Sequence, residues 1–151
     1  MTHAHAAESP TRAAVHATLH CLTGCAIGEV LGMVLATAFG WGGVASIALA
    51  IILAFLFGYA LTVRPLVGAG IPLRRAARLA LASDTVSIAT MELVDNAFIV
   101  VVPGALAAGL GDGLFWWSLA VSLAVAFVAA LPVNRWLILR GRGHAVVHAA
   151  H

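Results

Sequence analysis

The 151-residue sequence has no lysine, and all eight of its basic residues are arginines. Without lysine, the chain cannot form the Schiff base that retinal, pyridoxal and some carbonyl substrates require. Charged residues make up only 9% of the chain, against about 25% in an ordinary soluble domain, and a net charge of +2 gives no case for nucleic-acid binding. The two cysteines, Cys21 and Cys25, are too few for a disulfide framework and match neither a CxxC motif nor a zinc ribbon.

Hydrophobic residues make up 62% of the chain, a share typical of membrane proteins. Four long apolar runs are each long enough to cross about 30 Å of hydrocarbon; they cover residues 18–39, 44–63, 79–102 and 114–133. We therefore expect an all-α polytopic integral membrane protein, with a bundle of four transmembrane helices over residues 18–136. Residues 1–17 and 137–151 are expected to be histidine-containing cytoplasmic tails. No stretch is long enough for a separate soluble catalytic domain, which disfavours an enzyme.

The arginines predict how the chain is oriented in the cell membrane. Arg12 precedes the first run, four arginines lie in residues 64–78 and three follow the fourth run, whereas the other two loops have none. The positive-inside rule then places both termini and the 64–78 loop in the cytoplasm, and residues 40–43 and 103–113 outside. The first run is too long for the hydrophobic region of a signal peptide and lacks a strongly basic start, so we expect it to stay in the mature protein.

Three acidic residues, Asp84, Glu92 and Asp95, lie within the third apolar run. Each costs about 2.5–3.5 kcal/mol near the centre of a bilayer on insertion scales, so we expect them to face neighbouring helices or water. At 100° per residue they gather on one side of the helix together with Ser87 and Met91. This side is either a hydrogen-bonded packing stripe or an ion or proton path, and the cost of intramembrane acids favours the path.

The first apolar run repeats this pattern, because Cys21, Cys25 and Glu29 recur every four residues. It also carries a double GxxxG motif in residues 24–32, and the fourth run carries serine and alanine every four residues from 118 to 130. Small residues at this spacing let helices approach closely. Two such seams exceed what one bundle needs, so we expect a homo-oligomer surrounded by the lipid bilayer.

The histidines lie outside the four runs or at the start of the first. His16 and His20 are four residues apart and adjoin Cys21, which makes them candidates for the cytoplasmic mouth of a metal path. A secondary set of metal candidates lies near the carboxyl terminus: His144, His148 and His151. The alternative for both sets is that solvated histidines of the tails buffer near neutral pH.

Thiol, imidazole and carboxylate ligands together suit transition metals, and the thioether of Met91 shifts the preference toward Cu(I). A transport path needs weak, successive ligand sets, because a closed four-ligand cage would hold the ion. The leading hypothesis is therefore transport or binding of a transition-metal ion, Cu(I) or a divalent metal such as Zn(II). The predicted metal residues are His16, His20, Cys21, Cys25, Glu29, Met91, Glu92 and Asp95, with Asp84 and Ser87 as further polar groups inside the membrane.

Two other functions remain open. The cysteines could serve a small membrane thiol-redox or cofactor-binding protein. However, β-carbons four residues apart on a helix are about 5–6 Å from each other, whereas a disulfide needs about 3.5–4.5 Å. The chain could also be a non-conducting assembly subunit.

Three segments resemble a known protein family. They read H-x-x-x-H-C-x-x-x-C-x-x-G-E over residues 16–29, D-T-x-S-I-x-x-M-E-x-x-D-N over residues 84–96 and P-V-N-R-W over residues 132–136. The sequence is similar, from about residue 14 to the carboxyl terminus, to an uncharacterised bacterial membrane family catalogued as domain of unknown function 4396. The resemblance implies a four-helix membrane domain and brings no established activity, cofactor or catalytic residue.

Overall fold

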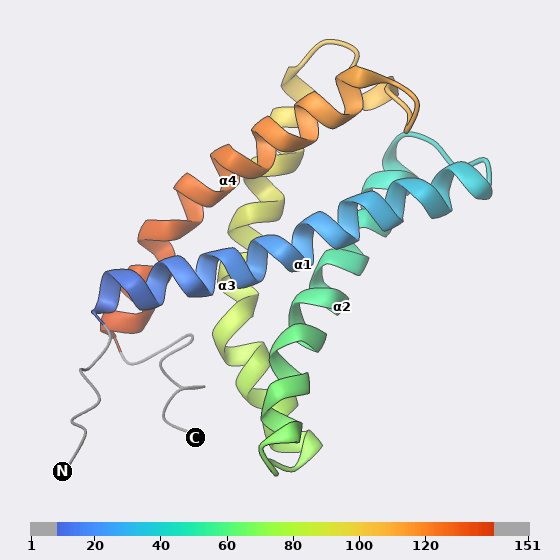
Figure 1. Ribbon diagram of the computed structural model, residues 1–151. Helices are drawn as coiled ribbons and strands as arrows, with labels where there is room; N and C mark the ends of the chain where they lie inside the picture. The colour runs from blue at the N-terminus through green and yellow to red at the C-terminus, as the bar shows by residue number, and fades with distance from the viewer. Residues whose placement is uncertain (1–8, 141–151) are drawn as a thin grey trace, which may run out of the picture.

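The computed structural model describes residues 9–140, which form four α-helices and one short 3-10 turn (Figure 1). The elements are α1 (Pro10–Ala38), α2 (Val44–Gly68), α3 (Leu73–Val101), η1 (Ala105–Ala107) and α4 (Gly113–Leu139). The predicted all-α fold is confirmed. Three of the helices, α1, α2 and α4, are long and apolar enough to cross a membrane. The fourth, α3, is as long as α1 and carries the three acids together with three arginines near its start.

The helices extend beyond the apolar runs at one end of the molecule. α1 begins at Pro10 because Ser9 caps it, accepting a hydrogen bond from the backbone N–H of Arg12 at 3.3 Å, and because proline suits the first position of a helix. α3 begins at Leu73, so the segment with the clustered arginines is helical. Pro65 lies inside α2, three residues before its end, where its carbonyl accepts a hydrogen bond from the N–H of Ala69.

The double GxxxG motif of α1 packs against α2 of the same chain. A β-carbon added to Gly24 would lie 2.7 Å from the Cα of Gly58, and one added to Gly32 would lie 2.7 Å from the Cα of Ala50. One added to Gly28 would lie even closer, 2.5 Å from the Cα of Ala54. Only glycine allows this approach of the two backbones. α1 and α2 therefore form one tightly joined hairpin.

The seam of small residues on α4 is also used inside the chain. Ser118, Ser122, Ala126 and Ala130 are all fully buried. The seams of α1 and α4 thus both pack within one molecule. Their small residues therefore give no separate reason to expect a homo-oligomer. The oligomer stays a prediction that rests on no observed surface.

The connections of the bundle lie at two opposite ends. The α1–α2 connection and the α3–α4 connection lie side by side at one end (Figure 1). At the opposite end the start of α1 and the end of α4 lie together, and the α2–α3 turn lies apart from them because the helices diverge. We call these the loop end and the arginine end. Between these ends α1 contacts each of the other three helices, so that residues far apart in sequence form layers across the bundle.

Candidate functional site

Three acidic side chains from two helices meet in the half of the bundle nearer the loop end. The carboxyl group of Glu29 on α1 faces that of Asp95 on α3, and the carboxyl group of Glu92 lies close to both. The thiol of Cys25, one turn before Glu29, lies beside Glu92. No basic side chain of residues 9–140 is among the groups that interact with these three carboxyls. We call Glu29, Glu92 and Asp95 the acid cluster.

Each carboxyl of the acid cluster has a buried oxygen to which no hydroxyl, amide or basic group of the described residues donates. Ser122 on α4 donates to Oδ1 of Asp95, and Asn96 donates to Oε2 of Glu92 at 3.4 Å. The atoms that remain, Oε1 of Glu29, Oε1 of Glu92 and Oδ2 of Asp95, are buried, and their carboxyls have only one another and the Cys25 thiol as further polar neighbours among the described residues. Glu92 and Asp95 are only 4% and 2% exposed. Burying a carboxylate oxygen without a partner is costly, so the cluster requires a proton or a cation.

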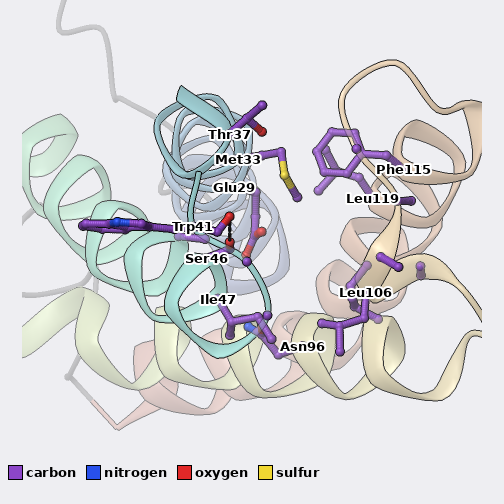
Figure 2. Close-up of a pocket in the computed structure, with 18 residues that line it drawn as sticks. Glu29, Met33, Thr37, Trp41, Ser46, Ile47, Asn96, Leu106, Phe115 and Leu119 are labelled. Carbon is purple, nitrogen blue, oxygen red and sulfur yellow. Dashed lines mark hydrogen bonds between the residues drawn. The ribbon is translucent and has the colours of Figure 1, made fainter. Parts of the chain in front are cut away.

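A cavity of about 290 Å³ connects the acid cluster with the loop end (Figure 2). It lies between the α1–α2 connection, η1 and the start of α4, and Glu29 is the only charged side chain in its wall. The side chains that define it include Glu29, Met33, Ser46, Asn96, Leu106 and Phe115. A single water molecule takes up about 30 Å³ of liquid, so the cavity has room for several waters around an ion at Glu29.

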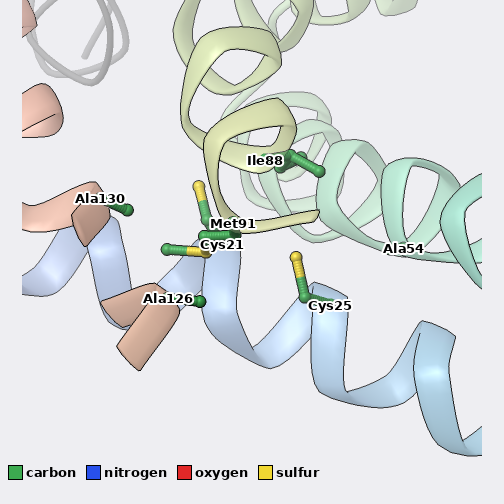
Figure 3. Close-up of a cluster of buried hydrophobic side chains, with 7 residues drawn as sticks. All are labelled: Cys21, Cys25, Ala54, Ile88, Met91, Ala126 and Ala130. Carbon is green, nitrogen blue, oxygen red and sulfur yellow. The ribbon is translucent and has the colours of Figure 1, made fainter. Parts of the chain in front are cut away.

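The next layer toward the arginine end is closed and contains sulfur. Cys21, Cys25 and Met91 pack there with four apolar side chains (Figure 3), which are Ala54, Ile88, Ala126 and Ala130. All seven are at most 1% exposed. We call these seven residues the sulfur layer. The layer borders polar groups on both sides, because the thiol of Cys25 lies beside Glu92 and the thiol of Cys21 bonds with the hydroxyl of Ser87.

Hydroxyl groups surround Asp84 on the far side of the sulfur layer. Thr62 on α2 donates to Oδ2 of Asp84 at 2.6 Å, and Ser83 donates to Oδ1 at 2.6 Å. Nε2 of His20 lies 2.8 Å from the hydroxyl oxygen of Thr62. Because the Thr62 hydroxyl gives its hydrogen to Asp84, it accepts the hydrogen bond from His20.

Asn134 joins three helices at the same height. Its side-chain Nδ2 donates to the hydroxyl oxygens of Thr18 on α1 and Ser87 on α3, both at 2.9 Å. Thr18, Ser87 and Asn134 are buried, as are Ser83 and Asp84. We call the two groups together the hydroxyl layer; it comprises Thr18, His20, Thr62, Ser83, Asp84, Ser87 and Asn134.

The predicted metal residues are distributed over these layers. Glu29, Glu92 and Asp95 come together as the acid cluster, Cys21, Cys25 and Met91 lie in the sulfur layer, and His20 lies in the hydroxyl layer with Asp84 and Ser87. His16 is exposed one turn before His20. Within residues 9–140, no three histidine, cysteine or acidic side chains are placed to hold one metal ion together. His144, His148 and His151 lie outside the described residues.

Several polar residues of the site carry no clear signal in the sequence. Ser122 belongs to a seam that predicts packing alone, yet its hydroxyl holds Asp95. Thr62 is the sole hydroxyl donor that α2 contributes to Asp84 among the described contacts. Met33 and Asn96 line the cavity, and their one available signal is spacing, because Met33 follows Glu29 by four residues and Asn96 follows Asp95 directly.

The comparisons with known proteins bear on the whole helical region. None of the curated proteins and none of the solved structures matches the chain. The family model described as Domain of unknown function (DUF4396) matches residues 11–143, which include the acid cluster, the sulfur layer and the hydroxyl layer. This match confirms the resemblance seen in the sequence. The chain belongs to the DUF4396 family.

Proposed function

We propose that this protein transports or binds a transition-metal ion, Cu(I) or a divalent metal, at the interface of α1, α3 and α4. One observation carries the proposal, namely the three buried carboxyls of the acid cluster, each with an oxygen to which no hydroxyl, amide or basic group of the described residues donates. Three acids at one height inside an apolar bundle carry a large cost unless a positive charge accompanies them. A cation supplied from the cavity meets that requirement.

The proposal includes α3 as a fourth membrane span. Its three acids are buried against the other helices, whereas its exposed large side chains beyond the arginines are Leu81, Val86, Leu93, Val100 and Val101. This distribution is what a span needs when it hides polar groups from lipid. We expect a multi-pass protein of the bacterial inner membrane, with the arginine end in the cytoplasm and the cavity open to the other side.

The chemistry of the neighbouring groups supports a transition metal over a hard cation. The Cys25 thiol lies beside Glu92, and the thioether of Met33 shares the cavity wall with Glu29. Mixed sulfur and oxygen ligands suit Cu(I), Zn(II) and neighbouring metals, whereas calcium and magnesium need an oxygen cage. The distribution of ligands over successive heights is consistent with passage of an ion, because a closed cage would retain it.

The test is metal uptake by proteoliposomes that contain the full chain, with Glu29→Gln as the variant. Glutamine keeps the shape of the side chain and removes the ionisable group, so we expect uptake of the transported metal to fall at least about tenfold. The matched control is Asp112→Asn, which changes an exposed acid in the α3–α4 connection and should leave uptake unchanged. Thermal unfolding in detergent, measured on both variants, reports whether either is misfolded.

Each outcome of this experiment either supports or contradicts the proposed metal transport. Loss of uptake in the Glu29→Gln variant alone, with normal thermal unfolding, supports the proposal. Uptake that equals that of the parent in both variants contradicts it and makes the acid cluster a packing feature. A parent protein that takes up neither Cu(I) nor Zn(II) also contradicts it, and favours thiol exchange or an assembly role.

A further inference from the structure

We infer that the ion is cuprous copper and that Met33 is its first sulfur ligand, inside the cavity. This inference rests on the proposed function, because it names which of the two kinds of metal uses the acid cluster. It commits to a soft monovalent ion and thereby excludes a divalent metal as the main substrate. It also adds Met33 as a ligand, one turn beyond Glu29 on the face of α1 that carries Cys21 and Cys25.

The first observation is where the sulfur atoms lie. The chain has two cysteines and three methionines, and Met1 is outside the described residues. Of the other four, Met33 is in the wall of the cavity, Cys25 lies beside Glu92, and Cys21 and Met91 complete the sulfur layer. Every sulfur among residues 9–140 therefore lies between the mouth of the cavity and the hydroxyl layer.

The second observation is the orientation of Met33. Its side chain projects toward the cavity from the same face of α1 as Glu29, one turn nearer the loop end (Figure 2). It is half-buried and packs against Ala108, Phe115 and Leu119. A leucine would fill that space equally well, since methionine and leucine exchange with little cost in most cores. The thioether is the one property of Met33 that packing does not use.

The third observation is the composition of the sulfur layer. Toward the arginine end, the acid cluster is followed by the sulfurs of Cys21, Cys25 and Met91, with the hydroxyl of Ser87 beside Cys21. Thiolate and thioether ligands select Cu(I), whereas hard divalent ions prefer oxygen ligands. The sulfur layer therefore offers a set of ligands that suits Cu(I).

The carboxyl and sulfur ligands have different roles. The carboxyls of the acid cluster supply negative charge, which attracts and neutralises any cation at the base of the cavity. The sulfurs before and after the cluster supply the discrimination, because a carboxylate alone does not distinguish Cu(I) from Zn(II) by softness. Met33 and the sulfur layer are thus specificity-determining residues, and the acid cluster is the shared cation site.

The experiment compares Cu(I), kept reduced with ascorbate, and Zn(II) in proteoliposomes that contain the full chain. The parent should take up Cu(I) in preference to Zn(II), and Ag(I), a non-redox ion of similar softness, should compete. Met33→Leu should weaken equilibrium binding of Cu(I), measured against the chelator bicinchoninate, about tenfold. Met91→Leu should slow Cu(I) uptake, because it removes a sulfur from the closed layer. Leu31→Met is the matched control, which places a thioether on α1 away from the cavity and should change nothing.

The outcomes separate this inference from the proposed function. A parent that takes up Zn(II) through Glu29 and ignores Cu(I) and Ag(I) overturns the inference while the proposed function stands. Equal Cu(I) affinity in the parent and the Met33→Leu variant, with uptake still lost in Glu29→Gln, overturns the role of Met33. Uptake of neither ion by the parent contradicts both proposals. A Met33→Leu variant with weaker Cu(I) binding and unchanged thermal unfolding supports the inference.

Discussion

The acid cluster and the hydroxyl layer both contain buried carboxyl groups, yet these groups differ in how many hydrogen bonds they accept. In the hydroxyl layer, both oxygens of Asp84 accept hydrogen bonds, from Ser83 and Thr62. In the acid cluster, each of the three carboxyls keeps a buried oxygen to which no hydroxyl, amide or basic group of the described residues donates. Complete hydrogen bonds let a buried polar group contribute to stability, whereas an incompletely bonded group calls for another explanation. The comparison therefore supports a stabilising role for the hydroxyl layer and is the basis of the cation site that we propose at the acid cluster.

The largest effect on stability is expected from Asp84→Ala. This change leaves the hydroxyls of Ser83 and Thr62 without their acceptor in a buried site, which costs roughly 1–3 kcal/mol for each group. We expect the free energy of unfolding in detergent to fall by about 3 kcal/mol. Asp112→Ala, in the exposed connection, is the control and should change it by less than about 1 kcal/mol. A neutral Asp84→Ala variant would remove the distinction between the two layers.

Asn134→Ala should have the next largest effect. The side chain of Asn134 connects α1, α3 and α4 through Thr18 and Ser87, and alanine removes both donors at once. We expect a loss of about 2 kcal/mol, because the two hydroxyls can still bond to the backbone of their own helices. Asn134→Asp, which lacks the amide donors, should be no better than alanine in the same unfolding assay. Recovery of stability by aspartate would show that the donated bonds are unimportant.

Asp95→Asn should change stability in the other direction. The new side chain keeps an acceptor for Ser122 and gains an amide donor for the carboxyl of Glu29. Unfolding should therefore become harder by up to about 1 kcal/mol, while metal binding falls. Stability and metal binding that fall together would place Asp95 with the structural residues of the hydroxyl layer.

The smallest change is expected from mild oxidation of the sulfur layer. Cys21 and Cys25 are free thiols one turn apart on the same helix, a geometry that opposes a disulfide between them. Thiol trapping after unfolding, read by mass spectrometry, should find two independently alkylated cysteines. The Cys25→Ser variant should show one alkylated cysteine. A complete bridge between Cys21 and Cys25 would favour thiol-redox chemistry over metal transport.

Much of the fold follows from the apolar runs, because helices of this length need little besides an uninterrupted hydrophobic segment. The true ends of α1 and α3 extend beyond those runs, since Ser9 and Pro10 start one helix and the arginine-rich segment after Leu73 is a good helix former without being apolar. Hydrophobicity identifies the part of a helix that suits a membrane. It does not identify where the helix begins.

The sequence predicts which residues belong to the site, but it does not predict which residue of α1 meets which residue of α3. The four-residue spacing of Cys21, Cys25 and Glu29 indicates one face of a helix, and that face does meet the acids of α3. Equal depths counted from Thr18 and Leu79 would pair Glu29 with Met91 and Glu92. The structure pairs it first with Asp95, three to four residues further along α3, and then with Glu92. This register depends on how the two helices pack against each other, which the sequence of neither helix alone specifies.

Metal stoichiometry tests the central claim most directly. The full-length protein is purified, dialysed against Cu(I) with ascorbate or against Zn(II), and analysed for metal per chain. We predict about one bound ion per chain in the parent and in the Asp84→Asn variant, and loss of that ion when Glu29, Glu92 and Asp95 are all replaced by their amides. A parent that stays metal-free, or a triple variant that keeps its ion, would contradict the assignment of the acid cluster as a cation site.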